Sequence, residues 1–284
     1  MEKLTNYGEG KRALASLLLL LGFVMGPVMA AQATLIGVSS SDPGKVYDVS
    51  PSTGAATELV STSRTSYTGA TFLGGDLFVS DVWSGSSYET GTVDLGTGTY
   101  TFVSDQGGSW DWHGLASDES AGLIYSIDID NGNVLKSMTA AGWITTIGTG
   151  AGIDGRGMAF DDTHNILYAT GSGPLGRILA TVDTVLGTSS LINYTGLSSS
   201  NYYEGLAYDE VSGILYLTSS TAGGVSSLYT VNVTTGLATL VGSTGVVRLD
   251  GLAWKANGVP EPATLALLGA GLAGLGFSRR RKSA

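Results

Sequence analysis

Five polar residues stand immediately before five glycines that recur along the chain at nearly equal intervals: Thr68, His113, Arg156, Glu204 and Asp250. If the fold gathers them, two carboxylates, an imidazole and a guanidinium can bind a hydroxyl-rich or charged ligand. Carboxylate and imidazole groups also bind metals, but Arg156 would itself compensate the acidic charge and argues against a divalent cation. The alternative is a polar, water-filled surface that binds nothing.

Aromatic residues accompany this polar position. All lie within four residues before a repeat glycine: Tyr67, Trp110, Trp112, Tyr202 and Tyr203. Flat amphipathic rings beside hydrogen-bonding groups are typical of sites that bind sugar faces. We therefore predict Trp110, Trp112, Tyr202 and Tyr203 as part of a binding site. Packing of the same rings between structural elements is the alternative.

Catalytic machinery is sparse. The chain has two histidines, His113 and His164, and lacks the Gly-x-Ser-x-Gly motif of a serine hydrolase. Glu204 and Asp250 are the kind of carboxylate pair that a glycosidase uses. No phosphate loop or dinucleotide fingerprint occurs, and the segment 128–132 lacks the later ligands of a calcium loop. We expect no cofactor and no metal, assign no catalytic residue, and favour binding over catalysis.

The repeat glycines define the elements that must position these side chains. They are separated by 45, 43, 48 and 46 residues: Gly69, Gly114, Gly157, Gly205 and Gly251. A second series, spaced by 44, 44, 45 and 49 residues, lies between alternating apolar runs: Gly54, Gly98, Gly142, Gly187 and Gly236. Glycine is typical where a hairpin reverses, because it accepts a positive φ without steric cost. A repeat of this length made of short strands indicates β-propeller blades.

We predict an all-β fold, a five-bladed β-propeller over residues 34–258. Three strands come before any repeat glycine and lack an inner strand of their own: Thr34–Ser39, Lys45–Val49 and Ala55–Val60. The missing strand is Leu249–Lys255, so pairing of the two chain ends closes the ring without an unpaired edge. Four complete blades lie between, at about 67–108, 109–152, 153–198 and 199–245.

This arrangement places the polar residues. The inner strand of each blade lines the central channel, so the residues before the repeat glycines lie near one mouth of that channel. His164 falls in a first-to-second turn, at the opposite end of the blades. In the third blade, Asn131-Gly132 predicts a two-residue hairpin.

The amino-acid sequence of the repeats resembles that of a known group of propellers. The segments LYTVNVTTGLATLVG and GLAYDEVSGILYL look like secreted propellers of the YVTN and NHL types, over about residues 34–258. The resemblance implies the architecture and not an activity, because propellers carry many unrelated functions.

Composition narrows the classes of function. The 284 residues include 43 glycines and no cysteine, which removes disulfides, thiolate metal sites and cysteine nucleophiles. The net charge is −10, and residues 34–258 hold 21 acidic and 7 basic residues. Such an acidic body repels phosphate backbones, so we expect no nucleic-acid partner.

The N-terminus has the features of a secretory signal over residues 1–33. Lys3, Lys11 and Arg12 precede the apolar run Ala13–Val28, and small residues allow cleavage after Ala30 or Ala33. We favour cleavage after Ala33. A retained membrane anchor is the alternative.

The C-terminus, residues 259–284, has three parts. Val259-Pro260-Glu261-Pro262 is followed by the apolar run Ala263–Phe277 and then by a basic cluster: Arg279, Arg280, Arg281 and Lys282. The run has 15 residues, short for a transmembrane helix of about 20. The order resembles the PEP-CTERM sorting signal, which implies processing by an exosortase in a Gram-negative bacterium. A plain anchor would not explain the Val-Pro-Glu-Pro.

Three classes of function remain. The first is an exported cell-surface or extracellular-matrix protein whose propeller binds exopolysaccharide or a surface protein. The second is an extracellular glycan-acting hydrolase or lyase with its site at the channel mouth. The third is a structural spacer without a specific ligand. The resemblance implies transient passage through the inner membrane in each case.

Overall fold

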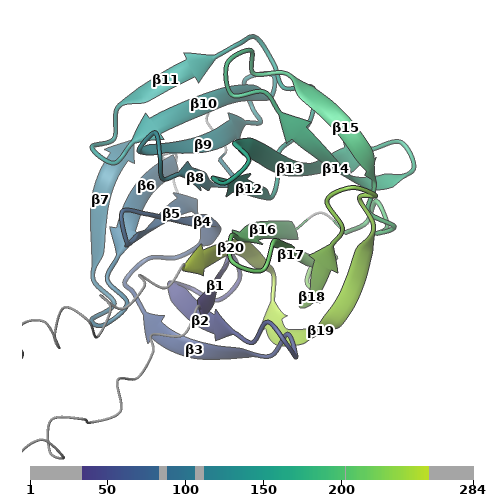
Figure 1. Ribbon diagram of the computed structural model, residues 1–284. Coiled ribbons are helices and arrows are strands. Elements are labelled where there is room, and N and C mark those ends of the chain that lie inside the picture. The colour runs from purple at the N-terminus through teal and green to yellow at the C-terminus, as the bar shows by residue number, and fades with distance from the viewer. Residues whose placement is uncertain (1–33, 83–87, 106–111, 202, 256–284) are drawn as a thin grey trace, which may run out of the picture. The chain divides into compact units, whose positions relative to one another are not determined.

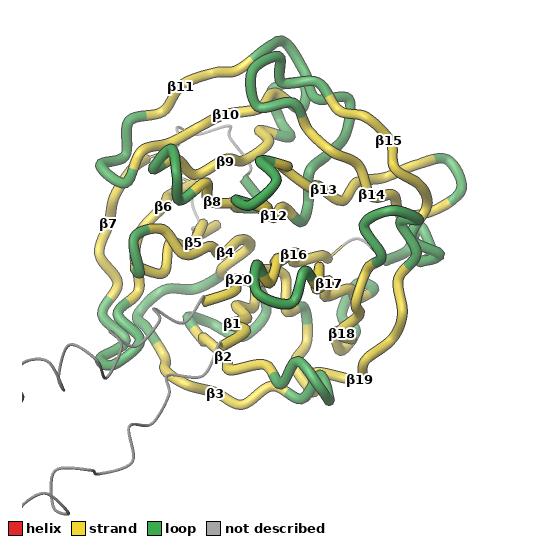
Figure 2. The backbone as a smooth tube through the Cα atoms, in the orientation of Figure 1, coloured by secondary structure: helices red, strands yellow, loops and turns green. Residues whose placement is uncertain are grey.

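The computed structural model describes residues 34–82, 88–105, 112–201 and 203–255, in which five four-stranded antiparallel sheets surround a central axis (Figure 1). Every described element is a strand or a loop, without a helix among these residues (Figure 2). Accordingly, the described part of the chain holds no helical span able to cross a membrane. The predicted all-β, five-bladed propeller is confirmed.

Each blade is given from its inner to its outer strand. Blade 1 comprises β20 (Leu249–Lys255), β1 (Thr34–Ser39), β2 (Lys45–Val49) and β3 (Ala56–Ser61). Blade 2 comprises β4 (Tyr67–Leu73), β5 (Asp76–Val82), β6 (Tyr88–Val93) and β7 (Tyr100–Asp105). Blade 3 comprises β8 (Ala116–Asp118), β9 (Leu123–Asp128), β10 (Val134–Thr139) and β11 (Ile144–Ile147). Blade 4 comprises β12 (Met158–Asp161), β13 (Ile166–Gly173), β14 (Gly176–Val182) and β15 (Ser189–Tyr194). Blade 5 comprises β16 (Tyr203–Asp209), β17 (Ile214–Ser220), β18 (Val225–Val231) and β19 (Ala238–Val247).

Blade 1 closes the ring as the sequence predicts. Strand β20 pairs with β1 in an antiparallel ladder that runs from Thr34 opposite Lys255 to Ser39 opposite Leu249. The first and last described strands therefore pair in one sheet, and β1 has a partner strand on each side.

The repeat glycines lie where inner strands of neighbouring blades approach one another most closely. A Cβ on Gly205 would lie 2.7 Å from the backbone nitrogen of Leu252, and one on Gly251 would lie 2.9 Å from that of Ala70. A Cβ on Gly69, Gly114 or Gly157 would likewise lie close to the inner strand of the next blade or to the segment just before it. Because Cβ atoms do not approach backbone so closely, the narrow ring of five blades requires glycine here.

The second glycine series meets two demands at once. Gly54, Gly98, Gly142, Gly187 and Gly236 all have positive φ, between 69° and 85°. Each also packs against the outer strand of the preceding blade, as where a Cβ on Gly142 would lie 2.7 Å from the Val103 carbonyl oxygen. Hairpin geometry and blade packing therefore select the same residue.

The hydrophobic core consists of five layers, each between two neighbouring blades. One layer joins Tyr125 and Leu135 of blade 3 to Met158 and Phe160 of blade 4. The other four layers join the remaining pairs of neighbours, including blade 5 with blade 1. Since every blade buries both faces, no blade has a core of its own.

The outer strands are interrupted by bulges. In blades 1, 2, 4 and 5 the register between third and fourth strands shifts near the middle of the ladder, at Val46/Tyr47, Thr90/Gly91, Leu179/Ala180 and Leu228/Tyr229. Blade 3 pairs β10 with β11 without a shift. A bulge bends an edge strand and disturbs its free hydrogen-bonding groups.

One local prediction is wrong. The loop between β9 and β10 contains five residues, 129–133, instead of the predicted two. The Asp128 carboxylate accepts hydrogen bonds from both the backbone nitrogen and the side-chain nitrogen of Asn131, at 3.2 and 2.9 Å. These bonds hold Asn131 in a loop, with Gly132 and Asn133 at positive φ.

Candidate functional site at the channel mouth

The residues before the repeat glycines lie in the first two positions of the inner strands in blades 1, 2 and 5 and two or three residues before them in blades 3 and 4, at the end opposite the first-to-second turns. Neighbouring members lie close together, because a Cβ on Gly205 would be 2.8 Å from the Asp250 carbonyl oxygen. Likewise, one on Gly114 would be 3.0 Å from the Arg156 carbonyl oxygen. The predicted column thus starts adjacent inner strands around one channel mouth.

Asp250 is the most perturbed member. Its side chain is 3% exposed, and burial raises its pKa to about 7. The Ser40 hydroxyl donates to Oδ2, and the charges of Arg248, His113 and Arg156 act in the opposite direction to burial. The other oxygen, Oδ1, is buried and has no hydrogen-bond partner within the described ranges.

Arg248 is held in an uncommon conformation beside this carboxylate. It has a φ of 51°, in the left-handed region, and its Nη2 lies 3.9 Å from Asp250 Oδ2. Its backbone oxygen accepts from the Ser40 nitrogen at 3.1 Å, so the same short segment fixes both Ser40 and Arg248. Backbone strain at such a position is common at binding sites.

Arg156 belongs to a second charged group at the mouth. Its Nε donates to Asp154 at 3.0 Å, and Arg177, which is buried, lies 3.9 Å from the same carboxylate oxygen. Burial alone would raise the pKa of Asp154, but the Arg177 charge, the Ser172 hydrogen bonds and the Arg156 charge outweigh it and lower the pKa. Asp154 therefore stays ionised and orients both guanidinium groups.

Two predicted site residues prove structural. Thr68 is buried, with its hydroxyl 3.1 Å from Ser80 Oγ and donating to the Trp112 carbonyl at 3.2 Å. Trp112 is 1% exposed and packs with Leu115 and Met138 between blades 2 and 3. Trp112 therefore does not stack on a ligand, and the alternative of packing between blades is correct for it. A tryptophan two residues before the repeat glycine can point toward the channel mouth or into the core between the blades.

Several other site residues cannot be placed by their side chains. Glu204 and Tyr203 lie in β16, where only their backbone is described, opposite Ser219 and Ser220. Trp110, Tyr202 and the sorting residues Val259, Pro260, Glu261, Pro262, Arg279, Arg280 and Arg281 lie outside the described residues, as does the segment 1–33. His113 is half-buried at the mouth.

Sequence reasoning missed a second polar layer behind the first. In four blades a buried polar residue near the end of the second strand faces the start of the inner strand: Ser39, Asp81, Asp128 and Ser219. Ser39 Oγ accepts from the backbone nitrogens of Ser41 and Asp42, at 3.0 and 3.1 Å. Asp128 holds the following loop in the same way. These residues shape the loops around the mouth.

Asp81 in this layer binds Arg64, which crosses from blade 1 to blade 2. Arg64 donates to Asp81 and to Glu89, and its guanidinium lies 4.4 Å from the centre of the Tyr100 ring. Burial raises the pKa of Asp81, and the Arg64 charge opposes this effect. The arrangement is a buried ion pair that fixes the loop between the two blades.

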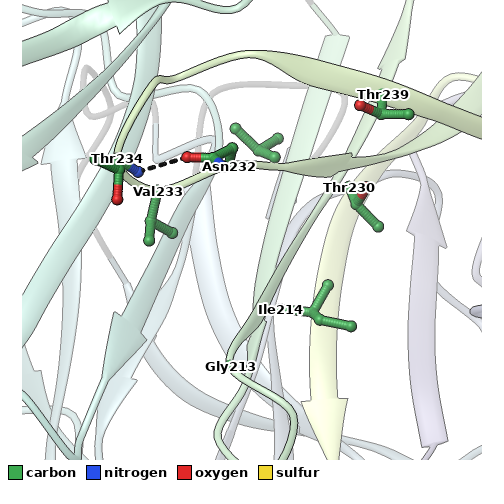
Figure 3. Close-up of a pocket in the computed structure, with 8 residues that line it drawn as sticks. Gly213, Ile214, Thr230, Asn232, Val233, Thr234 and Thr239 are labelled. Atoms are coloured by element: carbon green, nitrogen blue, oxygen red, sulfur yellow. Dashed lines mark hydrogen bonds between the residues drawn. The ribbon is translucent and has the colours of Figure 1, made fainter.

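A hollow of about 400 Å³ lies elsewhere, at the other end of blade 5 (Figure 3). Its lining comprises Gly213, Ile214, Thr230, Val231, Asn232, Val233, Thr234 and Thr239. The side-chain oxygen of Asn232 accepts a hydrogen bond from the Thr234 backbone nitrogen at 2.9 Å, within its own turn. The lining has no ionisable side chain, so this hollow does not extend the candidate site.

No group of three or more His, Cys, Asp or Glu side chains able to hold a metal occurs within the described ranges. The carboxylates of the mouth are instead committed to arginines and hydroxyls, as at Asp154 and Asp250. What the arrangement offers chemically is two partly exposed arginines, Arg156 paired with the half-buried Asp154 and Arg248 near the buried Asp250.

The described strands form a five-bladed β-propeller, and this arrangement is similar to parts of solved structures. One chain of the nidogen/laminin complex is 15% identical, with a TM-score of 0.54, and the match covers 80% of this chain and 99% of that one. TolB from Acinetobacter baumannii is 12% identical with a TM-score of 0.48, over 73% of this chain and 51% of that one. No curated protein matches the sequence.

Residues 258–282 match the family described as the PEP-CTERM protein-sorting motif. The chain thus carries this motif behind a propeller, as the resemblance of its C-terminus implies. The motif assigns it to exported proteins that an exosortase processes and sorts toward the cell surface.

Proposed function

We propose that the exported propeller is a binding platform at the cell surface or in the extracellular matrix, with its ligand site at the channel mouth. The ligand class is an exopolysaccharide or a surface protein. The observation that supports this most is the buried carboxylate of Asp250, which has Arg248 Nη2 at 3.9 Å and whose pKa the charges of His113 and Arg156 also lower.

The route to the surface is part of the proposal. The signal at 1–33 starts translocation, and Ala263–Phe277 halts in the inner membrane of a Gram-negative cell with Arg279–Lys282 on the cytoplasmic side. Exosortase then cuts near Pro260-Glu261-Pro262 and releases the body, residues 34–258. Mass spectrometry of the mature protein tests this route, and a C-terminus at Ala284 in an exosortase-containing cell contradicts it.

Binding is tested with the propeller, residues 34–258, on a glycan array. Arg156→Ala and Glu204→Ala are expected to weaken binding at least tenfold, which corresponds to about 1.4 kcal/mol. Val211→Ala, at an exposed turn away from the mouth, serves as the control. Equal binding by all variants contradicts the placement of the site, and no binding to any glycan or surface protein favours a structural spacer.

A glycan-acting hydrolase or lyase is the alternative. One observation favours it, because a carboxyl with a pKa of about 7 suits a general acid. Against it, Asp250 is almost fully covered and Oδ2 is bonded to Ser40. Release of reducing ends that disappears in Asp250→Asn, with binding retained, would support the enzyme instead of the platform.

A further inference from the structure

Both ends of the propeller leave it at one end of the blades. Thr34 faces Lys255 in the closing ladder, whereas Ser39 faces Leu249 at the other end of the same ladder, beside the channel mouth. The chain therefore continues toward its sorting motif from the end opposite Asp250.

The connection that follows is short. Only seven residues separate Lys255 from Ala263, the first residue of the apolar run, so even fully extended the eight Cα–Cα steps between them span at most about 29 Å. Pro260 and Pro262 restrict it further.

This length is too small to let the propeller turn over. A path around the outside of a blade crosses four strands and then climbs the length of a seven-residue strand, together more than about 40 Å. A path between two blades is closed, because neighbouring inner strands pack closely at the repeat glycines.

We propose that the membrane-anchored precursor turns the end that carries both termini toward the lipid surface and holds the channel mouth away from it. This inference rests on the proposed function in one respect, the anchoring of Ala263–Phe277 in a bilayer. The ligand site is then open to the exterior before the exosortase cuts.

The short connection between Lys255 and Ala263 sets this orientation, and no attraction between the propeller and the lipid is needed. The first-to-second turns at the lipid-facing end are linked by carboxylates: Glu119 accepts from the Gly74 nitrogen, Asp162 from the Glu119 nitrogen at 2.9 Å, and Glu210 from the Asp162 nitrogen at 2.6 Å. Such an acidic end is repelled by anionic headgroups.

The test uses the precursor after removal of the signal, residues 34–284, whose lack of cysteine allows single labels. Val211→Cys lies in the turn between β16 and β17, at the lipid-facing end, and Leu175→Cys in the loop between β13 and β14, at the mouth end. The two native side chains are 86% and 83% exposed, which makes the positions a matched pair. Each variant carries a donor dye and is reconstituted in phosphatidylcholine vesicles with an acceptor-labelled lipid.

Energy transfer from position 211 is expected to exceed that from position 175 several-fold, and a flexible Gly/Ser insert of about 20 residues after Asn257 is expected to remove the difference. Equal or reversed transfer in the native-length chain overturns the orientation alone. A difference that survives the insert overturns the tether argument. Failure of the chain to float with the vesicles overturns the anchoring, and the orientation with it.

Discussion

Gly205 and Asp250 meet across the boundary between blade 5 and blade 1, where a methyl group on Gly205 would lie 2.8 Å from the Asp250 carbonyl oxygen. Neither partner can yield easily, because both are inner-strand backbone. Gly205→Ala is therefore expected to cost about 3 kcal/mol of unfolding free energy or more, as overpacking does in well-packed interiors. Denaturant unfolding measures this cost.

Gly223→Ala is the control for that substitution. Gly223 also lies in blade 5, at a φ of 70°, but a Cβ there would meet nothing within 4 Å. Only the cost of a positive φ remains, about 1 kcal/mol. Equal losses for the two variants would contradict the account of the repeat glycines.

Strand β20 is expected to be essential for a stable monomer. A chain ending at Gly245 lacks β20 and exposes the inner edge of β1, so it should unfold or aggregate. A chain ending at Gly258 keeps the closing ladder and should behave as a monomer. Size-exclusion chromatography with light scattering compares the two, and a monomeric, folded shorter chain would remove the argument for closure.

The predictions for Gly205 and for β20 use features that the sequence already shows. The repeat glycines are visible there because of a steric requirement. Gly205 and its equivalents recur because all five inner strands meet the same obstacle, so a single residue type marks every blade. The end-to-end pairing was also visible, because Leu249–Lys255 completes a blade that lacks its inner strand.

The site was less predictable, since its residues differ from blade to blade. Ser39, Asp81, Asp128 and Ser219 occupy related positions, but serine alternates with aspartate there and blade 4 has no equivalent among them, so no single residue type marks the layer. Trp112 was difficult for another reason. An aromatic residue beside the mouth is suited both to stacking on a ligand and to packing in the core, and only its burial in the structure distinguishes the two roles.

Asp250 is expected to make stability fall as pH rises from about 4 to about 7. Its pKa is about 7 in the folded protein against an ordinary value of 3.8, so in this window the folded state keeps a proton that the unfolded chain has released. Asp250→Asn removes the titration while an amide oxygen can still accept from Ser40.

The variant should therefore be more stable than the native protein above pH 7, by at most about 4 kcal/mol, and nearly equal to it near pH 4. Thermal or denaturant unfolding at several pH values checks the difference. A difference in unfolding free energy between the two proteins that stays constant with pH would show that Asp250 does not titrate in this range.

Arg64→Leu is expected to destabilise the protein by about 3 kcal/mol, because it leaves the buried carboxylate of Asp81 without its cation. The double variant Arg64→Leu/Asp81→Asn should recover much of this loss. Lys45→Leu breaks an exposed pair with Glu58, 3.0 Å long, and should change stability little. If the double variant is no better than the single one, the loss comes from packing against Tyr100 instead.

The bulged outer strands bear on whether copies of the propeller pair edge to edge. Each blade ends in an outer strand that is the last in its sheet. The shifts at Tyr47, Gly91, Ala180 and Tyr229 keep four of these rims from joining another copy in long, regular contact. Blade 3 lacks the shift, but its outer strand is only four residues long. These outer strands therefore disfavour edge-to-edge pairing between copies of the propeller.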